Sequence, residues 1–261
     1  MKPLFDTLTS PRTLSQEIEQ RIETAIRQRQ LGRGEKLPSE KELCAMFNVS
    51  RTALREALQA LNARNLVTIR KGSGVFVNDF SPNHASKPMG LFLELNFKRD
   101  YIFHLIHVRQ MIEPLIAKEA AKNRSDVQCR QLQDIIEGMS GTSDDKGLAK
   151  LDLEFHYKLV ECSGNPILSL IMKPVFQLMP KVKLLMVQKV KKEKRYTAAH
   201  FHQSIFEAVL NQDVEKSEEA MLEHLKVAEE DARLLLDTLA PDEELYLEDL
   251  AEFDLNTLDI N

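Results

Sequence analysis

The spacing of apolar residues changes along this chain and separates regions of different predicted structure. From residue 89 onward apolar positions recur every three or four residues almost throughout, as expected for helices packed in a bundle. Between residues 65 and 77 the period is two, which predicts a β-hairpin. The predicted helices of the second region cover residues 89–95, 99–122, 126–138, 146–163, 166–190, 197–211 and 214–239. The fold is therefore predicted to be mainly α.

Two short helical segments precede the hairpin. The first follows Ser39, whose hydroxyl can cap a helix start, and Glu42 stands three residues later, where it completes a capping box. This segment ends near Phe47, and Ser50 is placed to cap a second helix. The opening turns of that helix carry two guanidinium groups and a hydroxyl, which suit contact with DNA bases and phosphates. These residues are Arg51, Thr52 and Arg55.

The hairpin has a basic tip that contains Lys71 and Gly72. A capped helix, a short turn, an arginine-bearing helix and a basic hairpin follow one another in the order of a winged helix-turn-helix. Each cation alone could be an ordinary solvated side chain, but the combination favours DNA binding. The charge of residues 1–80 is consistent with DNA binding, since they hold 13 Lys+Arg against 9 Asp+Glu, a net charge of +4.

This first part of the chain resembles the DNA-binding domain of the GntR family of bacterial transcription regulators. The resemblance rests on the segments LPSEKEL, NVSRTALREAL and RKGSGVFV. It implies that DNA is contacted by the matching residues Lys41, Arg51, Thr52, Arg55, Lys71 and Gly72. The position of Lys41 is often arginine in that family, and a lysine offers a point charge instead of a planar fork, which puts a bidentate contact there in doubt.

The length of the chain predicts a second domain with its own core. We expect a DNA-binding domain over residues 1–80, a turn-rich linker over 81–88, an all-helical domain over 89–240 and an acidic tail over 241–261. No apolar run is long enough to cross a bilayer, and the N-terminus lacks a secretory signal, so we expect a cytoplasmic protein and no membrane partner. Pro174 and Pro180 predict a kink or break in the helix over 166–190.

Four residues of the helical region form a candidate metal site. Asp152 and His156 stand four residues apart, so a helix presents both side chains on one face. His202 and His224 follow in two later helices, each among apolar residues at core spacing. A single buried histidine is usually satisfied by a hydrogen bond, but three imidazoles with a carboxylate match a divalent metal. The set favours zinc, with nickel, manganese or iron as alternatives.

The second half resembles the FCD domain, the all-helical ligand-binding domain of one GntR branch, over about residues 89–236. The resemblance rests on VRQMIEPLIAKEAA, DLEFHYKLVECSGNP, HFHQSIFEAVLNQD and MLEHL. It implies a divalent metal held by the four residues named above, with a small organic acid bound beside it. Arg109 matches an arginine of that cavity and would hold the acid's carboxylate. A surface ion pair between Arg109 and Glu113 is the alternative.

These observations predict a homodimeric regulator, with repression favoured, that binds a palindromic operator under the control of a small carboxylate. A dimer is expected because one recognition helix reads only a few base pairs. Two alternatives stay open, namely a metal-dependent hydrolase fused to a DNA-binding module and a DNA-binding regulator whose metal is purely structural. The basic segment 181–195 is expected to be a solvated face or a protomer contact.

Overall fold

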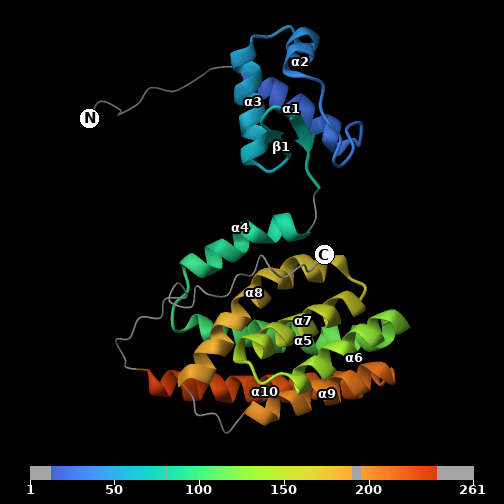
Figure 1. Cartoon of the computed structure of the whole chain (residues 1–261), viewed down its shortest axis with the longest axis vertical. Coiled ribbons are helices and arrows are strands. Elements are labelled where there is room, and N and C mark those ends of the chain that lie inside the picture. The colour runs from blue at the N-terminus through green and yellow to red at the C-terminus, as the bar shows by residue number, and fades with distance from the viewer. Residues whose placement is uncertain (1–12, 80–81, 190–194, 240–261) are drawn as a thin grey trace, which may run out of the picture. The chain divides into compact units, whose positions relative to one another are not determined.

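The computed structural model describes residues 13–79, 82–189 and 195–239. The chain divides into two compact units, Met1–His84 and Ala85–Asn261. As predicted, it is mainly helical, with a two-stranded hairpin at the end of the first unit and an all-helical second unit (Figure 1). The acidic tail expected over residues 241–261 lies outside the described residues.

The first unit opens with a helix that the sequence analysis did not predict, α1 (Leu14–Arg27). Thr13 and Gln16 form a capping box at its start, and Ile18, Ile22 and Ile26 recur every fourth residue and are buried. Burying an isoleucine side chain contributes about 1.5–3 kcal/mol, so this stripe is enough to hold α1 against the rest of the unit. The capping box and the isoleucine spacing are both legible in the sequence.

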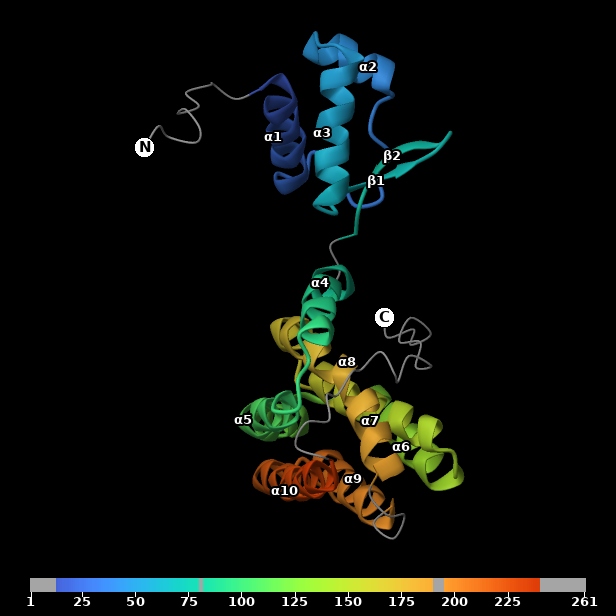
Figure 2. The same cartoon turned by 90° about the vertical axis from the view of Figure 1, so that its left-hand side faces the viewer.

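The helix-turn-helix is formed by α2 (Glu40–Phe47) and α3 (Arg51–Ala63). Asn48 ends α2 with a left-handed backbone at φ 54°, and the Ser50 hydroxyl accepts a hydrogen bond from the Ala53 amide at 3.3 Å to begin α3. Figure 2 shows α1 and α3 side by side, and their apolar faces share one core. The fully buried side chains of α3 in this core are Leu54, Ala57, Leu58 and Leu61.

The hairpin consists of β1 (Val67–Arg70) and β2 (Gly74–Val77), which pair antiparallel. The register places Val67 opposite Val77 and Arg70 opposite Gly74. Val67, Val75 and Val77 are buried in the same core as α3, as the period of two predicts. This packing anchors the base of the hairpin and leaves the turn at residues 71–73 exposed.

The second unit consists of α4 (Pro82–Leu95), α5 (Tyr101–Asn123), α6 (Asp126–Gly141), α7 (Asp145–Cys162), α8 (Pro166–Lys189), α9 (Arg195–Leu210) and α10 (Val214–Thr238). Helix α7 lies between α5, α6 and α8, and its fully buried Phe155 and Leu159 belong to the main core. Helices α9 and α10 run side by side, and α10 packs along α5 (Figures 1 and 2). Helix α5 contacts α7, α9 and α10, and α8 contacts α7 and α10, so packing connects all five of these helices.

Two helix boundaries differ from those predicted. Helix α4 begins at Pro82 and not at residue 89, so residues 82–88 of the expected linker are helical, and the division between the two units, at His84 and Ala85, falls among them. Pro82 occupies the first helical position, where a missing amide costs nothing, and Gly90 is buried where Gln177 of α8 approaches it. Helix α6 continues past Gly138, which lies close to Leu151 of α7. Helix α8 contains both prolines and continues past them as one element, so of the two predicted alternatives, a kink or a break, there is no break.

No helix among the described residues is long and apolar enough to cross a membrane.

Candidate functional site

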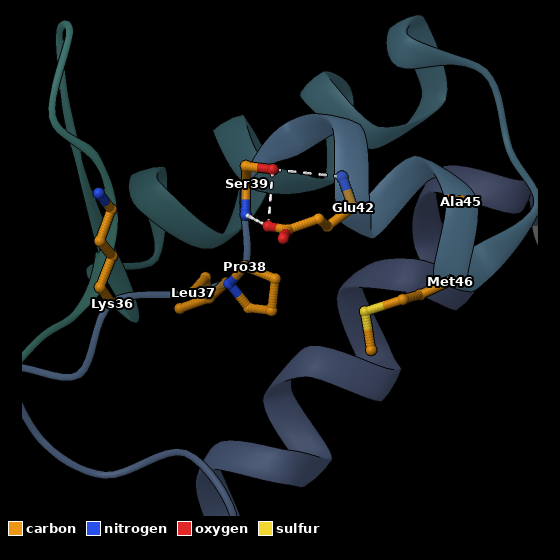
Figure 3. A pocket seen from close by; sticks show the side chains of 7 residues that line it. All are labelled: Lys36, Leu37, Pro38, Ser39, Glu42, Ala45 and Met46. Atoms are coloured by element: carbon orange, nitrogen blue, oxygen red, sulfur yellow. Dashed lines mark hydrogen bonds between the residues drawn. The ribbon is translucent and has the colours of Figure 1, made fainter.

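The start of α2 is held by a capping box whose two residues, Ser39 and Glu42, line a pocket together with Leu37, Pro38 and Met46, among others (Figure 3). The Ser39 amide donates to Glu42 Oε2 at 2.8 Å, the Ser39 hydroxyl donates to the same oxygen at 2.7 Å, and the Glu42 amide donates to Ser39 Oγ at 3.3 Å. These hydrogen bonds lower the pKa of Glu42. The predicted capping box is thus present, and it sets where α2 begins.

All six predicted DNA-contact residues are exposed. Arg51, Thr52 and Arg55 lie on the first two turns of α3, while Lys41 lies on the first turn of α2. Lys71 and Gly72 form the turn between β1 and β2, and Gly72 adopts φ +77°, a conformation that favours glycine. An added Cβ at Gly72 would meet no atom within 4 Å, so the tip of the hairpin is open.

Arg55 of α3 forms an ion pair with a residue of α2. Arg55 Nε pairs with Glu40 Oε2 at 3.0 Å, and the two side chains are 65% and 36% exposed. This contact links α2 to α3 and leaves both terminal nitrogens of Arg55 available. The sequence analysis did not identify Glu40, although it lies directly beside Lys41. Arg70 adds a further exposed cation to the hairpin, where its guanidinium lies 4.7 Å from the centre of the Phe76 ring.

In the second unit the structure brings together all four predicted metal ligands. Asp152 and His156 come from α7, His202 from α9 and His224 from α10, and all four are buried. One ligand atom of each lies within 4.8 Å of the others. Asp152 Oδ1 is 3.2 Å from His202 Nε2, and His156 Nε2 is 3.3 Å from His224 Nε2. Around tetrahedral zinc, neighbouring nitrogen and oxygen ligands lie about 3.3 Å apart, so these two separations match such a site and the four residues could hold a metal ion.

The protonation of this Asp/His cluster also suits a metal. Burial lowers the pKa of His224 well below its ordinary value, and neighbouring His202 and His156 lower it further. Burial also lowers the pKa of His202, although Asp152 opposes the change. Burial is the largest single influence and would raise the pKa of Asp152, but the Lys183 charge, the hydrogen bond with His202 and the charges of the neighbouring histidines together outweigh it and hold the pKa well below the ordinary value. The cluster therefore presents neutral His202 and His224 with an ionised carboxylate, the forms that bind metal.

Arg109 and Glu113, both on α5, form a second layer against the cluster. Arg109 Nε donates to Glu113 Oε1 at 2.5 Å, and Glu113 Oε2 lies 2.6 Å from His156 Nδ1. Burial would raise the pKa of Glu113, but the charges of Arg109 and His156 lower it to about 2. The predicted alternative of an Arg109 to Glu113 ion pair is thus present, but the pair is buried instead of lying on the surface.

The same arginine also faces the Asp/His cluster. Arg109 Nη2 lies 3.1 Å from His156 Nε2, so one guanidinium contacts both Glu113 and the cluster. A carboxylate that holds the second ring nitrogen of a metal-binding histidine fixes the orientation of that ring. Glu113 occupies this position, and the sequence analysis named it only as a surface partner of Arg109.

At two lysines of α8 the structure contradicts the solvated face, one of the two alternatives predicted for the segment 181–195. Lys181 is buried against Glu94 of α4, and Lys183 donates to Asp152 Oδ1, so neither belongs to a solvated face. Residues 190–194 of this segment lie outside the described residues. No spacing rule in the sequence connects Lys183 with Asp152, because the two residues lie on different helices.

Comparison with known proteins assigns both units. The family model described as "Bacterial regulatory proteins, gntR family" matches residues 14–77, and that of the FCD domain matches residues 104–227. The HTH-type transcriptional regulator LutR of Bacillus subtilis (strain 168) is 32% identical over 212 residues, covering 78% of this chain and 94% of LutR. The HTH-type transcriptional repressor NanR of Salmonella newport (strain SL254) is 32% identical over 214 residues, covering 81% of this chain and 82% of NanR.

Among solved structures, Streptococcus agalactiae GntR is similar over 83% of this chain and 99% of its own, with 26% sequence identity and a TM-score of 0.64. The matching families and these relatives are transcription regulators, which sets aside the hydrolase alternative. The chain belongs to the GntR family of bacterial regulatory proteins, in the branch with an FCD domain, and is a DNA-binding transcription regulator.

Proposed function

We propose that this regulator acts as a homodimer, holds a divalent metal in its FCD domain, and changes its operator affinity when a small carboxylate binds at that metal. The observation that carries the proposal is the buried Asp/His cluster with the Arg109 guanidinium beside it. The NanR relative is named a repressor, which favours repression for this chain also.

The metal would be held by Asp152, His156, His202 and His224. Zinc is the first candidate because three imidazoles and one carboxylate suit it, with nickel, manganese and iron as alternatives. A metal with a free coordination position supplies a Lewis-acidic centre for a carboxylate oxygen. Glu113 would keep the His156 ring in the orientation that presents Nε2 to the ion.

Arg109 is the proposed effector-binding residue of the second unit. Its guanidinium is buried, already oriented by Glu113, and in contact with a proposed metal ligand. Guanidinium groups bind carboxylates through charge-assisted hydrogen bonds, which are stronger where water is excluded. An organic acid bound to the metal would therefore meet a fixed cation. A metal with a purely structural role is the alternative, and it predicts that no acid affects DNA binding.

The DNA contacts would come from two parts of the first unit. Arg51, Arg55 and Thr52 open the recognition helix and would contact base edges and phosphates. Lys41 and the hairpin tip at Lys71 and Gly72 would supply mainly phosphate and groove contacts. Two such units related by a twofold axis would read a palindrome.

The DNA assignment is tested with the single variants Arg51→Ala, Arg55→Ala, Lys41→Ala and Lys71→Ala. Affinity for the chain's own promoter region is measured at several salt concentrations by fluorescence anisotropy. We expect either arginine variant to lose more affinity than either lysine variant, and the lysine variants mainly to reduce the salt dependence. Equal losses in all four variants would contradict this division of roles.

The effector assignment is tested by thermal-shift measurements on metal-loaded protein with a panel of sugar acids, hydroxy acids and dicarboxylates. A compound that stabilises the protein is then titrated against the complex with promoter DNA. We expect the compound to change operator affinity in the wild type and to lose its effect in Arg109→Met. If zinc binds but no acid in the panel changes stability or DNA affinity, the purely structural metal is the correct interpretation.

A further inference from the structure

Lys183 of α8 contacts the same carboxylate oxygen that faces the metal cluster. Its ammonium group donates to Asp152 Oδ1, and this oxygen is also 3.2 Å from His202 Nε2. The other groups at the cluster are more deeply enclosed, since the side chains of Arg109, Glu113, His156 and His202 are at most 3% exposed, whereas that of Lys183 is 27% exposed. Lys183 is therefore more exposed to solvent than these four side chains.

A divalent metal and the Lys183 ammonium compete for one position. If the metal takes Asp152 as a ligand, it places two positive charges where the ammonium group now contacts the carboxylate. Charges a few Å apart repel by several times the thermal energy even at a high effective dielectric constant. The flexible lysine stem allows the ammonium to leave Asp152, and the partly exposed position lets it do so without unfolding α8.

We propose that Lys183 binds two partners in turn. In the metal-free protein it binds Asp152, and once a metal has displaced Lys183 from Asp152, the lysine binds the anionic group of the effector. This inference rests on the proposed metal and effector function. Arg109 would then contact the bound carboxylate from the buried side and Lys183 from the side nearer solvent. Lys183 would make the site specific for anionic effectors, because its positive charge stabilises only an anion bound at the metal.

The first test measures zinc affinity alone, by competition with a chromophoric chelator in the full-length protein. Because Lys183→Met removes the competing cation, we expect zinc to bind about tenfold more tightly than in the wild type. Lys183→Arg keeps the charge and should stay near the wild-type affinity. Lys118→Met is the matched control, since Lys118 pairs with Glu218 at similar exposure, 32%, on helices α5 and α10.

The second test uses the cobalt-loaded protein, whose visible absorption reports on the ligands of the metal. Acetate, the simplest carboxylate, is titrated into wild type, Lys183→Met and Lys118→Met. We expect acetate to bind several-fold more weakly in Lys183→Met only. Zinc affinity that is unchanged or weaker in Lys183→Met, or acetate affinity equal to that of the wild type, overturns the inference.

A failure of the proposed function gives a different result. If the wild type binds neither zinc nor cobalt, the metal site itself is wrong and both proposals fall. If the wild type binds metal and acetate but Lys183→Met behaves like the Lys118→Met control, only the role of Lys183 is refuted.

Discussion

Removal of the Glu113 carboxylate should destabilise the helical unit far more than a surface ion pair would suggest. The variant Glu113→Gln keeps the size of the side chain but leaves the Arg109 guanidinium without its counter-charge. Both side chains are at most 3% exposed, so water cannot replace the lost partner. Breaking a buried pair in this way costs about 3–5 kcal/mol.

The chain contains a matched control of the same spacing. Glu229 and Arg233 of α10 also stand four residues apart and pair at 2.6 Å, but their side chains are 22% and 66% exposed. Glu229→Gln should therefore cost only about 0.3–0.5 kcal/mol. The helix spacing and the residue types are the same, and burial is the largest difference between the two pairs. Each glutamate also has one further partner, since Glu229 accepts a hydrogen bond from Gln110 at 2.9 Å and Glu113 contacts His156 at 2.6 Å.

The measurement is urea unfolding of the metal-free full chain, followed by circular dichroism. At a slope of roughly 2 kcal/mol per molar urea, Glu113→Gln should move the midpoint of the helical unit down by about 1.5–2.5 M. The double variant Arg109→Met with Glu113→Leu should recover part of this loss, because no unpaired charge remains. The reasoning is refuted if Glu113→Gln costs no more than Glu229→Gln, or if the double variant is less stable than the single one.

Three further predictions concern the DNA-binding residues and pH. Glu40→Gln should tighten binding to unrelated DNA, because it removes a negative charge. It should also lower the preference for the operator, because Arg55 loses the contact that orients it. Competition between operator and random duplexes measures both affinities. Gly72→Ala should cost about 1 kcal/mol of stability in thermal unfolding, because its φ of +77° is strained for alanine, and an unchanged midpoint would contradict this. Burial lowers the pKa of His202 and His224, so as the pH falls the unfolded chain binds protons that the folded chain does not. The metal-free protein should therefore be most stable above about pH 6.5 and lose stability as the pH falls below that value. A melting temperature that stays constant or rises from about pH 8 to about pH 5.5 would be inconsistent with neutral imidazoles.

What the sequence determines here is local. The Ser39 and Glu42 capping box, the alternation of the hairpin valines and the four-residue spacing of Asp152 and His156 all follow from the geometry of one element. Such features are legible because the backbone itself sets which side chains share a face or reach a free amide. Helix α1 is legible in the same way, through the Thr13 capping box and the four-residue spacing of its isoleucines.

The tertiary structure decided the rest of the site. That Arg109 and Glu113 form a buried pair, and that this pair meets His156, depends on how α5 packs against α7. Lys183 reaches Asp152 only because α8 lies along α7, and no residue spacing encodes that contact. Residues far apart in the chain are brought together by packing of whole apolar faces, so their polar contacts cannot be derived from the period of any single helix.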